Sequence, residues 1–153
     1  GVLVGSFLGF LLHEEAHKRV SARLGCVSGF VLWPPGLALT LLSVVARSVG
    51  VPLVFIAPGY VRSICPPWSG ETWWASLAGP ATNILLAGLG LAAYAATGIA
   101  FATGLAEINA WIALFNLLPI PPLDGYTVAR TAPHAWLPAL LAAAVLLYAA
   151  QTL

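Results

Sequence analysis

Four long stretches of the chain carry no charged residue, and they constrain its fold more than any other feature. They cover residues 24–46, 72–106, 108–123 and 131–153. A helix needs about 20 mostly apolar residues to cross a bilayer. Only 7% of the 153 residues are charged, against about 25% in soluble domains. We therefore expect an integral membrane protein, a polytopic all-α bundle of transmembrane helices in one domain spanning residues 1–153.

The apolar pattern predicts four helices, at residues 2–22, 72–95, 105–118 and 135–152. A further stretch, residues 36–57, is long enough to cross once but contains Arg47, Gly50 and Pro52. We expect a helix to about residue 49 and then extended chain. Residues 36–61 are therefore predicted to form a broken or re-entrant segment.

The basic residues predict the orientation of the first helix. Lys18, Arg19 and Arg23 crowd its C-terminal end, and the positive-inside rule places such an end in the cytoplasm. A multi-pass protein follows, with the C-terminal end of its first helix towards the cytoplasm. Because the formal net charge is only +1, without a basic stripe, we expect no nucleic-acid partner. The expected partners are the lipid bilayer and other apolar or membrane-bound molecules.

Two cysteines, Cys26 and Cys65, stand far apart and show no CxxC spacing. Neither repeats a metal-ligand pattern. We expect two free thiols, buried or at the membrane interface, rather than a disulfide.

Residues 13–17 read His-Glu-Glu-Ala-His, near the end of the first predicted helix. On a helix, the i, i+4 spacing places both imidazoles on one face, where they can bind one zinc ion. Glu14 would lie beside the metal as a candidate base. Ionisable groups at bilayer depth are costly and usually functional, which favours a site over histidines solvated at a helix end. We expect Glu15 to be solvated or paired with a nearby Lys or Arg.

A catalytic zinc takes three protein ligands and keeps one position open for water. Asp124 is the favoured third ligand because three prolines interrupt the helix before it and Gly125 allows a tight backbone after it. Irregular backbone survives at membrane depth only when buried in protein or lining a watery cavity. The alternative is a proline-kinked loop whose aspartate caps the next helix. The other candidate ligands are Glu71, Glu107 and His134.

Asn83 stands early in the apolar run that begins at residue 72. An amide side chain in a lipid-embedded helix needs hydrogen-bond partners. It could donate to a substrate carbonyl or to a zinc-bound oxygen. Equally, it could join neighbouring helices, with Gly79, Ala81 and Gly88 as a small-residue packing surface. The sequence leaves both alternatives open.

Three motifs, in this order, resemble the site-2 protease family of intramembrane zinc metalloproteases. They are His-Glu-x-x-His closing one helix, AGPATN opening another, and NLLPIPPLDG following a third. The resemblance covers residues 2 to about 130. Many members have Asp-Gly-Gly where this chain has Asp124-Gly125-Tyr126, which leaves the packing after the aspartate open. Residues 29–67 match the family least, and no PDZ-like or nucleotide-binding domain is seen.

The resemblance implies that His13, His17 and Asp124 bind one zinc ion per chain and that Asn83 lies near the scissile bond. Zinc lowers the pKa of its bound water to about 7, and Glu14 is the implied base for that water. The implied substrate is itself a transmembrane segment, cut within or at the edge of the bilayer in regulated intramembrane proteolysis.

Two functions of other classes remain as alternatives. A catalytically silent relative would only bind a membrane partner, but binding alone does not need Glu14. A metal-handling or transport protein would need a relay of intramembrane carboxylates, which the sequence lacks. Within the enzyme class, the nearest variant is a zinc protease with Glu71 or Glu107 as third ligand.

Overall fold

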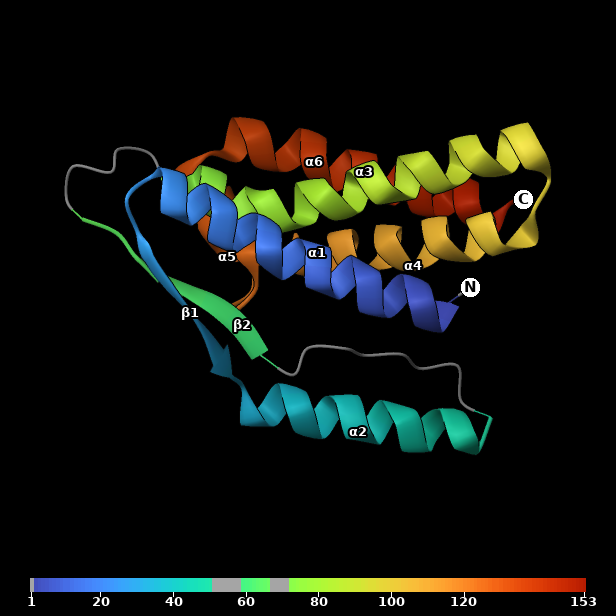
Figure 1. The fold of residues 1–153 in the computed structure, drawn as a ribbon, viewed down its shortest axis with the longest axis horizontal. Helices are drawn as coiled ribbons and strands as arrows, with labels where there is room; N and C mark the ends of the chain where they lie inside the picture. Colours follow the sequence, from blue (N-terminus) through green and yellow to red (C-terminus); the bar gives the residue numbers. More distant parts are fainter. Residues whose placement is uncertain (1, 51–58, 67–71) are drawn as a thin grey trace.

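The computed structural model describes residues 2–50, 59–66 and 72–153. Its main body is a bundle in which α3 packs on the three other long helices (Figure 1). These are the four helices that the apolar pattern predicts, although the one predicted at residues 105–118 begins five residues earlier than expected. Their bounds are α1 (Val2–Arg23), α3 (Trp73–Thr97), α4 (Ala100–Asn116) and α6 (Pro133–Gln151).

Small residues let α3 and α4 approach closely. Ala87, Ala106 and Ala110 are fully buried between the helices. A Cβ atom at Gly90 would lie 2.9 Å from the carbonyl oxygen of Ala102 and 2.9 Å from the amide nitrogen of Ala106. Because lipid offers no hydrophobic driving force between helices, such close backbone packing is the usual source of association in a bilayer.

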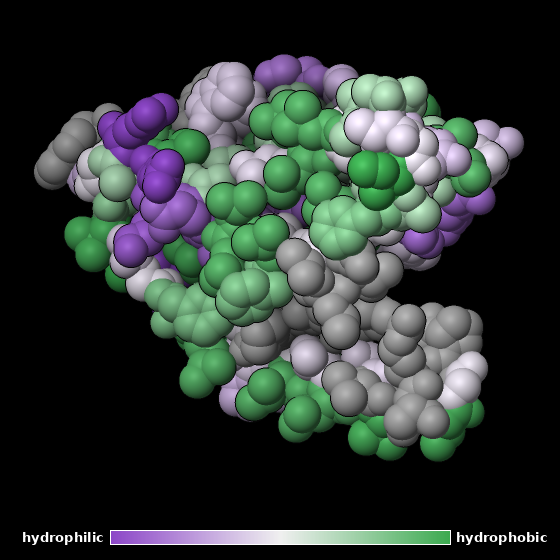
Figure 2. All heavy atoms as spheres, turned by 45° about the vertical axis from the view of Figure 1, so that its right-hand side comes forward, coloured by the Kyte–Doolittle hydropathy of each residue, from purple (hydrophilic) through white to green (hydrophobic). Residues whose placement is uncertain are grey.

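Two of the described helices, α3 with 25 residues and α6 with 19, are long and apolar enough to cross a membrane. By contrast, α4 has 17 residues and the second half of α1 carries five charged residues. Figure 2 shows hydrophobic side chains over much of one face of the molecule, with the largest hydrophilic group at the left edge and smaller ones at the top and right. The exposed side chains of α3 and α6 include Leu85, Leu89, Leu141 and Val145.

A two-stranded antiparallel sheet, which was not predicted, accompanies the helices. The strands are β1 (Val27–Leu32) and β2 (Gly59–Ile64), with Val27 opposite Ile64 and Leu32 opposite Gly59. Hydroxyl groups join the sheet to the bundle, because Ser63 on β2 hydrogen-bonds to Ser21 at the end of α1 at 2.7 Å and to Ser28 on β1 at 2.8 Å. The sheet is thereby fixed beside the C-terminal half of α1.

The prediction of free thiols is wrong, because Cys26 and Cys65 form a disulfide. Each cysteine lies next to one end of the paired strands. Since Val27 pairs with Ile64, the sheet itself brings the two residues together, although 39 positions separate them in the sequence. The disulfide therefore closes the end of the sheet at which both strands meet α1.

The segment 36–61, which was predicted to be broken, begins with most of the helix α2 (Pro34–Ser48) and ends in the extended chain of β2. In Figure 1, α2 lies beside the bundle on the far side of the sheet. Residues 51–58, on which the predicted break falls, lie outside the described residues. The helix is therefore confirmed to residue 48, whereas a re-entrant path through the membrane stays a prediction.

Candidate metal centre

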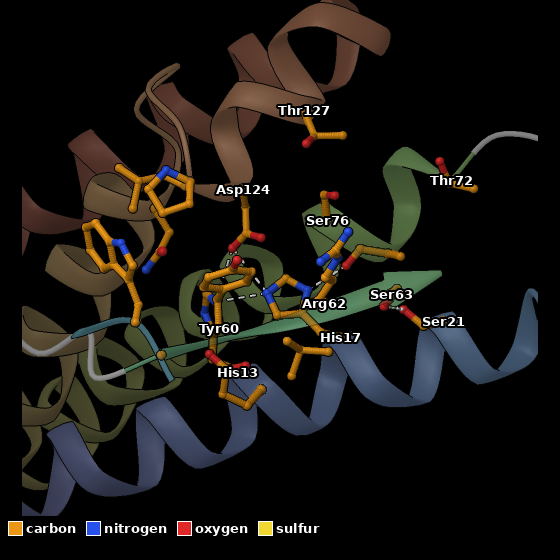
Figure 3. A pocket seen from close by; sticks show the side chains of 18 of the residues that line it. His13, His17, Ser21, Tyr60, Arg62, Ser63, Thr72, Ser76, Asp124 and Thr127 are labelled. Atoms are coloured by element: carbon orange, nitrogen blue, oxygen red, sulfur yellow. Dashed lines mark hydrogen bonds and ion pairs between the residues drawn. The ribbon is translucent and has the colours of Figure 1, made fainter. Parts of the chain in front are cut away.

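Two imidazoles from α1 and one carboxylate converge on a single point (Figure 3). Asp124 is the first residue of the short helix α5 (Asp124–Thr131). The Nε2 atoms of His13 and His17 lie 3.0 Å apart. The Oδ2 atom of Asp124 lies 3.2 Å from Nε2 of His13 and 3.1 Å from Nε2 of His17. Tetrahedral ligands at zinc–ligand distances of 2.0–2.2 Å stand about 3.3–3.6 Å apart, so this triangle is close in size to three corners of a zinc site.

The outer hydrogen bonds of both rings show that this point suits a cation. Nδ1 of His17 lies 2.6 Å from the backbone carbonyl oxygen of Ala75, and Nδ1 of His13 lies 2.5 Å from the amide oxygen of Asn83. Because both oxygens are acceptors, both Nδ1 atoms must donate, which leaves an Nε2 lone pair on each neutral ring. Two lone pairs and a carboxylate oxygen therefore face one another, which is the donor set of a metal site with two histidines and one acid.

Glycine at position 79 is what allows the rings to lie against α3. A Cβ atom there would collide with Nε2 of His17 and with the His13 ring. Both histidines are buried, with 3% and 7% of their surfaces exposed. The glycine of the AGPATN motif therefore provides the backbone surface against which the two imidazoles pack.

A second glycine, Gly125, allows the backbone next to Asp124 to pack closely against the residue that follows α4. A Cβ atom at Gly125 would collide with the backbone carbonyl of Leu117, the C-cap residue that follows α4. The same carbonyl oxygen accepts a hydrogen bond from Nε1 of Trp136 on α6 at 2.8 Å. Gly125 is thus required for close approach rather than for an unusual backbone angle, and α4 and α6 together place the carboxylate.

Glu14 lies beside the triangle with one oxygen engaged and one free. Its carboxylate accepts a hydrogen bond from the backbone N–H of Val61 on β2. The other oxygen, Oε2, is buried and has no hydrogen-bond partner among the described residues. An unpaired buried carboxylate oxygen is costly, so Oε2 could accept a hydrogen bond from a ligand bound beside His13, His17 and Asp124.

A cavity of about 330 Å³ opens onto these side chains. Its walls come from α1, β2, α3, α4 and α5, so the fold surrounds the site on several sides. Besides the metal-binding group, it is lined by polar side chains that Figure 3 shows around the site. They include Ser21, Tyr60, Arg62, Thr72, Ser76, Asn116 and Thr127.

Asn83 lies behind His13 rather than in the cavity. It is fully buried, and its Nδ2 donates to the carbonyl oxygen of Gly9 at 3.2 Å and to Oδ1 of Asn109 at 2.8 Å. Its oxygen accepts from His13, so both its nitrogen and its oxygen have hydrogen-bond partners. This placement favours the alternative in which Asn83 joins helices over direct contact with a substrate.

The remaining candidates lie apart from the triangle in the described part of the chain. His134 stacks edge-on against Trp73, with ring centroids 5.8 Å apart. Glu107, on α4, does not belong to the group that could hold a metal, and Glu71 lies outside the described residues. Glu15 accepts a hydrogen bond from Nε of Arg19 at 2.8 Å, which confirms the expected pairing.

Two asparagines near the site were not predicted. Asn109 is fully buried on α4, and Asn116 at the end of that helix lines the cavity. The reasoning that singled out Asn83 applies to both, because each amide stands in or beside an uncharged run and needs partners there.

Comparison with known proteins finds relatives whose names all read "putative zinc metalloprotease". MJ0611 of Methanocaldococcus jannaschii is 33% identical in an alignment 144 positions long, gaps included, which covers 88% of this chain and 71% of the relative. Rip2 of Mycobacterium tuberculosis is 33% identical in an alignment 155 positions long, gaps included, which covers 87% of this chain and 56% of the relative. YwhC of Bacillus subtilis is 43% identical over 67 residues, covering 35% of this chain and 31% of the relative. No protein-family model and no solved structure matches the chain.

Proposed function

The chain belongs to the zinc metalloprotease family of its archaeal relative MJ0611, and on this premise we propose that it is an intramembrane protease of the site-2 type. It hydrolyses peptide bonds within or near transmembrane segments of membrane-protein substrates. The observation that carries the proposal is the convergence of His13, His17 and Asp124, with Glu14 beside them, inside a bundle with an apolar surface.

Each residue of the site has a role in this chemistry. His13, His17 and Asp124 hold zinc, which when bound supplies a Lewis acid for activating water and polarising a carbonyl. The free oxygen of Glu14 takes a proton from the attacking water and returns it to the leaving amine. The hydrogen bond from Val61 holds the other oxygen of Glu14, which fixes the direction in which the base faces.

The edge of β2 that faces Glu14 is the proposed place for the substrate backbone. β1 occupies one edge of β2, whereas the N–H of Val61 points to Glu14. In the described part of the chain no strand pairs with this second edge, which therefore faces the metal-binding group. A substrate segment that unwinds and adds there as a strand gains backbone hydrogen bonds while its scissile bond lies beside Glu14.

The proposed setting is a multi-pass membrane protein with its site towards the cytoplasm. α3 and α6 are the candidate spans, and α1 and α4, which pack on α3, would cross with them. Lys18, Arg19 and Arg23 follow the metal-binding residues on α1, and the positive-inside rule assigns that end to the cytoplasm.

A cleavage assay tests the proposal. The protein is reconstituted in vesicles with a panel of transmembrane peptides, and products are mapped by mass spectrometry; soluble peptides of matched length serve as controls. We expect cleavage within or at the edge of the apolar segments, loss with a chelator and recovery with zinc. If the protein binds zinc but cleaves none of the peptides, the result would instead support the alternative that it is a catalytically silent relative that binds a membrane partner.

A further inference from the structure

A chain of hydrogen bonds runs from His13 across three helices. Nδ1 of His13 on α1 donates to Oδ1 of Asn83 on α3 at 2.5 Å. Nδ2 of Asn83 donates to Oδ1 of Asn109 on α4 at 2.8 Å, and Nδ2 of Asn109 donates to the carbonyl oxygen of Leu105 at 2.9 Å. Both asparagines are fully buried.

Backbone carbonyls fix the direction of every bond in this chain. The carbonyls of Gly9 and Leu105 can only accept, so the Nδ2 atoms of Asn83 and Asn109 must face them. The oxygen of Asn83 must then face His13, and the ring must carry its proton on Nδ1. In a neutral imidazole this leaves the lone pair on Nε2, the atom that faces His17 and Asp124.

We infer that Asn109 is a positioning residue of the metal centre, which holds His13 through Asn83 in the tautomer and ring orientation that bind a metal. The inference rests on the zinc site of the proposed function but not on proteolysis. Partners behind a metal-binding histidine orient the ring and tune its affinity. Here that partner is an amide rather than a carboxylate, so a second amide is needed to complete its hydrogen bonds.

The packing around the amides gives independent support. A Cβ atom at Gly9 would lie 2.5 Å from Oδ1 of Asn109 and 3.3 Å from Nδ2 of Asn83. α1 therefore reaches the two amides only because position 9 is glycine. The amide pair therefore packs directly against the backbone of α1, one turn before His13.

A purely structural role in joining helices would also place amides here, so the test must separate zinc affinity from stability. Asn109→Leu removes the acceptor for Asn83, whereas Asn109→Asp keeps an acceptor of the same shape. Thr82→Val is the matched control, because Thr82 stands next to Asn83 on α3 and its hydroxyl donates to the carbonyl of Ala78 within the same helix.

The measurement is the zinc dissociation constant of the full chain in detergent, by competition with a chromophoric chelator, alongside thermal unfolding of the metal-free protein. We expect Asn83→Leu to weaken zinc binding about 10- to 100-fold and Asn109→Leu about 3- to 30-fold. Asn109→Asp should bind zinc within about 2-fold of wild type even where its unfolding temperature falls, and Thr82→Val should match wild type.

The double variant Asn83→Leu/Asn109→Leu completes the test. Because Asn109 acts through Asn83, the double variant should bind zinc no more weakly than Asn83→Leu alone. Fully additive losses, or unchanged affinity in Asn109→Leu, would overturn the inference. If Asn109→Leu does not fold, Gly9→Ala decides, with weaker zinc binding expected and wild-type affinity overturning the inference. Absence of zinc binding in the wild type would instead remove the metal site itself.

Discussion

Gly79 faces His13 so closely that no side chain fits between them. A Cβ atom at position 79 would lie 2.5 Å from Nε2 of His13 and 2.6 Å from its Cδ2. The backbone of α3 therefore forms one wall of the metal centre. A glycine that appears in the sequence as a helix-packing residue is in the structure part of the site.

Gly79→Ala should therefore displace both imidazoles and weaken zinc binding by about 10-fold or more. Gly88→Ala, on the same helix, is the matched control because its Cβ would meet nothing within 4 Å. Zinc affinity in detergent, with helix content from circular dichroism, checks the pair. Equal affinity in the two variants would mean that the rings do not pack on α3 as described.

Glu14→Gln should abolish cleavage and leave zinc bound, because the amide keeps the shape of the side chain but cannot take a proton. Removing such a base typically costs about 10²- to 10⁴-fold in rate. The rate of peptide cleavage and the zinc content of the same preparation are measured together. Turnover at the wild-type rate would exclude Glu14 as the base.

Asp124→Ala should lose activity and bind zinc much more weakly, because two neutral histidines leave the charge of the metal uncompensated. Asp124→Asn should also be impaired, since the amide brings no charge. Glu107→Ala and Glu71→Ala should keep both properties. An active Asp124→Ala beside an inactive glutamate variant would move the chain to another type of zinc protease.

Replacing Cys26 and Cys65 with alanine should lower stability by about 2–4 kcal/mol, the typical contribution of a disulfide. The same change frees one end of β2, which lines the cavity, so substrate cleavage should fall more than zinc affinity. Thermal unfolding with and without reductant measures the stability. Reductant should have no effect on the double variant, and an equal effect on both proteins would contradict a disulfide.

Residues 19 and 130 should lie on the same side of the membrane, because α1 and α5 meet at the metal centre. The positive-inside rule predicts the cytoplasmic side, whereas a disulfide is typical of an oxidising compartment. Cysteines placed at 19 and 130, with Cys26 and Cys65 replaced, report the side by labelling with an impermeant reagent. Labelling from opposite sides would contradict the shared site.

The sequence predicts α3 and α6 well, because they lie within the uncharged runs 72–106 and 131–153, and it predicts α4 with a start five residues too late. It does not predict the sheet, because β1 pairs with a strand 27 or more residues further along the chain and local propensity says little about such partners. The disulfide was missed for the same reason, since its geometry depends on that pairing.

The sequence also predicts that His13 and His17 face one point, where the structure has a group that could hold a metal ion, because their i, i+4 spacing sets their geometry within a single helix. Asp124 required the further argument from the prolines before it. The role of Asn83 could not be predicted, since a buried amide can serve a substrate or a neighbouring side chain. Only the packing of α1, α3 and α4 shows that its oxygen accepts from His13.

X-ray absorption at the zinc edge on the purified protein tests the metal centre most directly. We predict about one zinc per chain, with only nitrogen and oxygen neighbours at about 2.0–2.2 Å, two of them imidazoles, and loss of this signal in Asp124→Ala. A sulfur neighbour at about 2.3 Å, or protein prepared without chelator that contains no zinc, would contradict a site made by His13, His17 and Asp124.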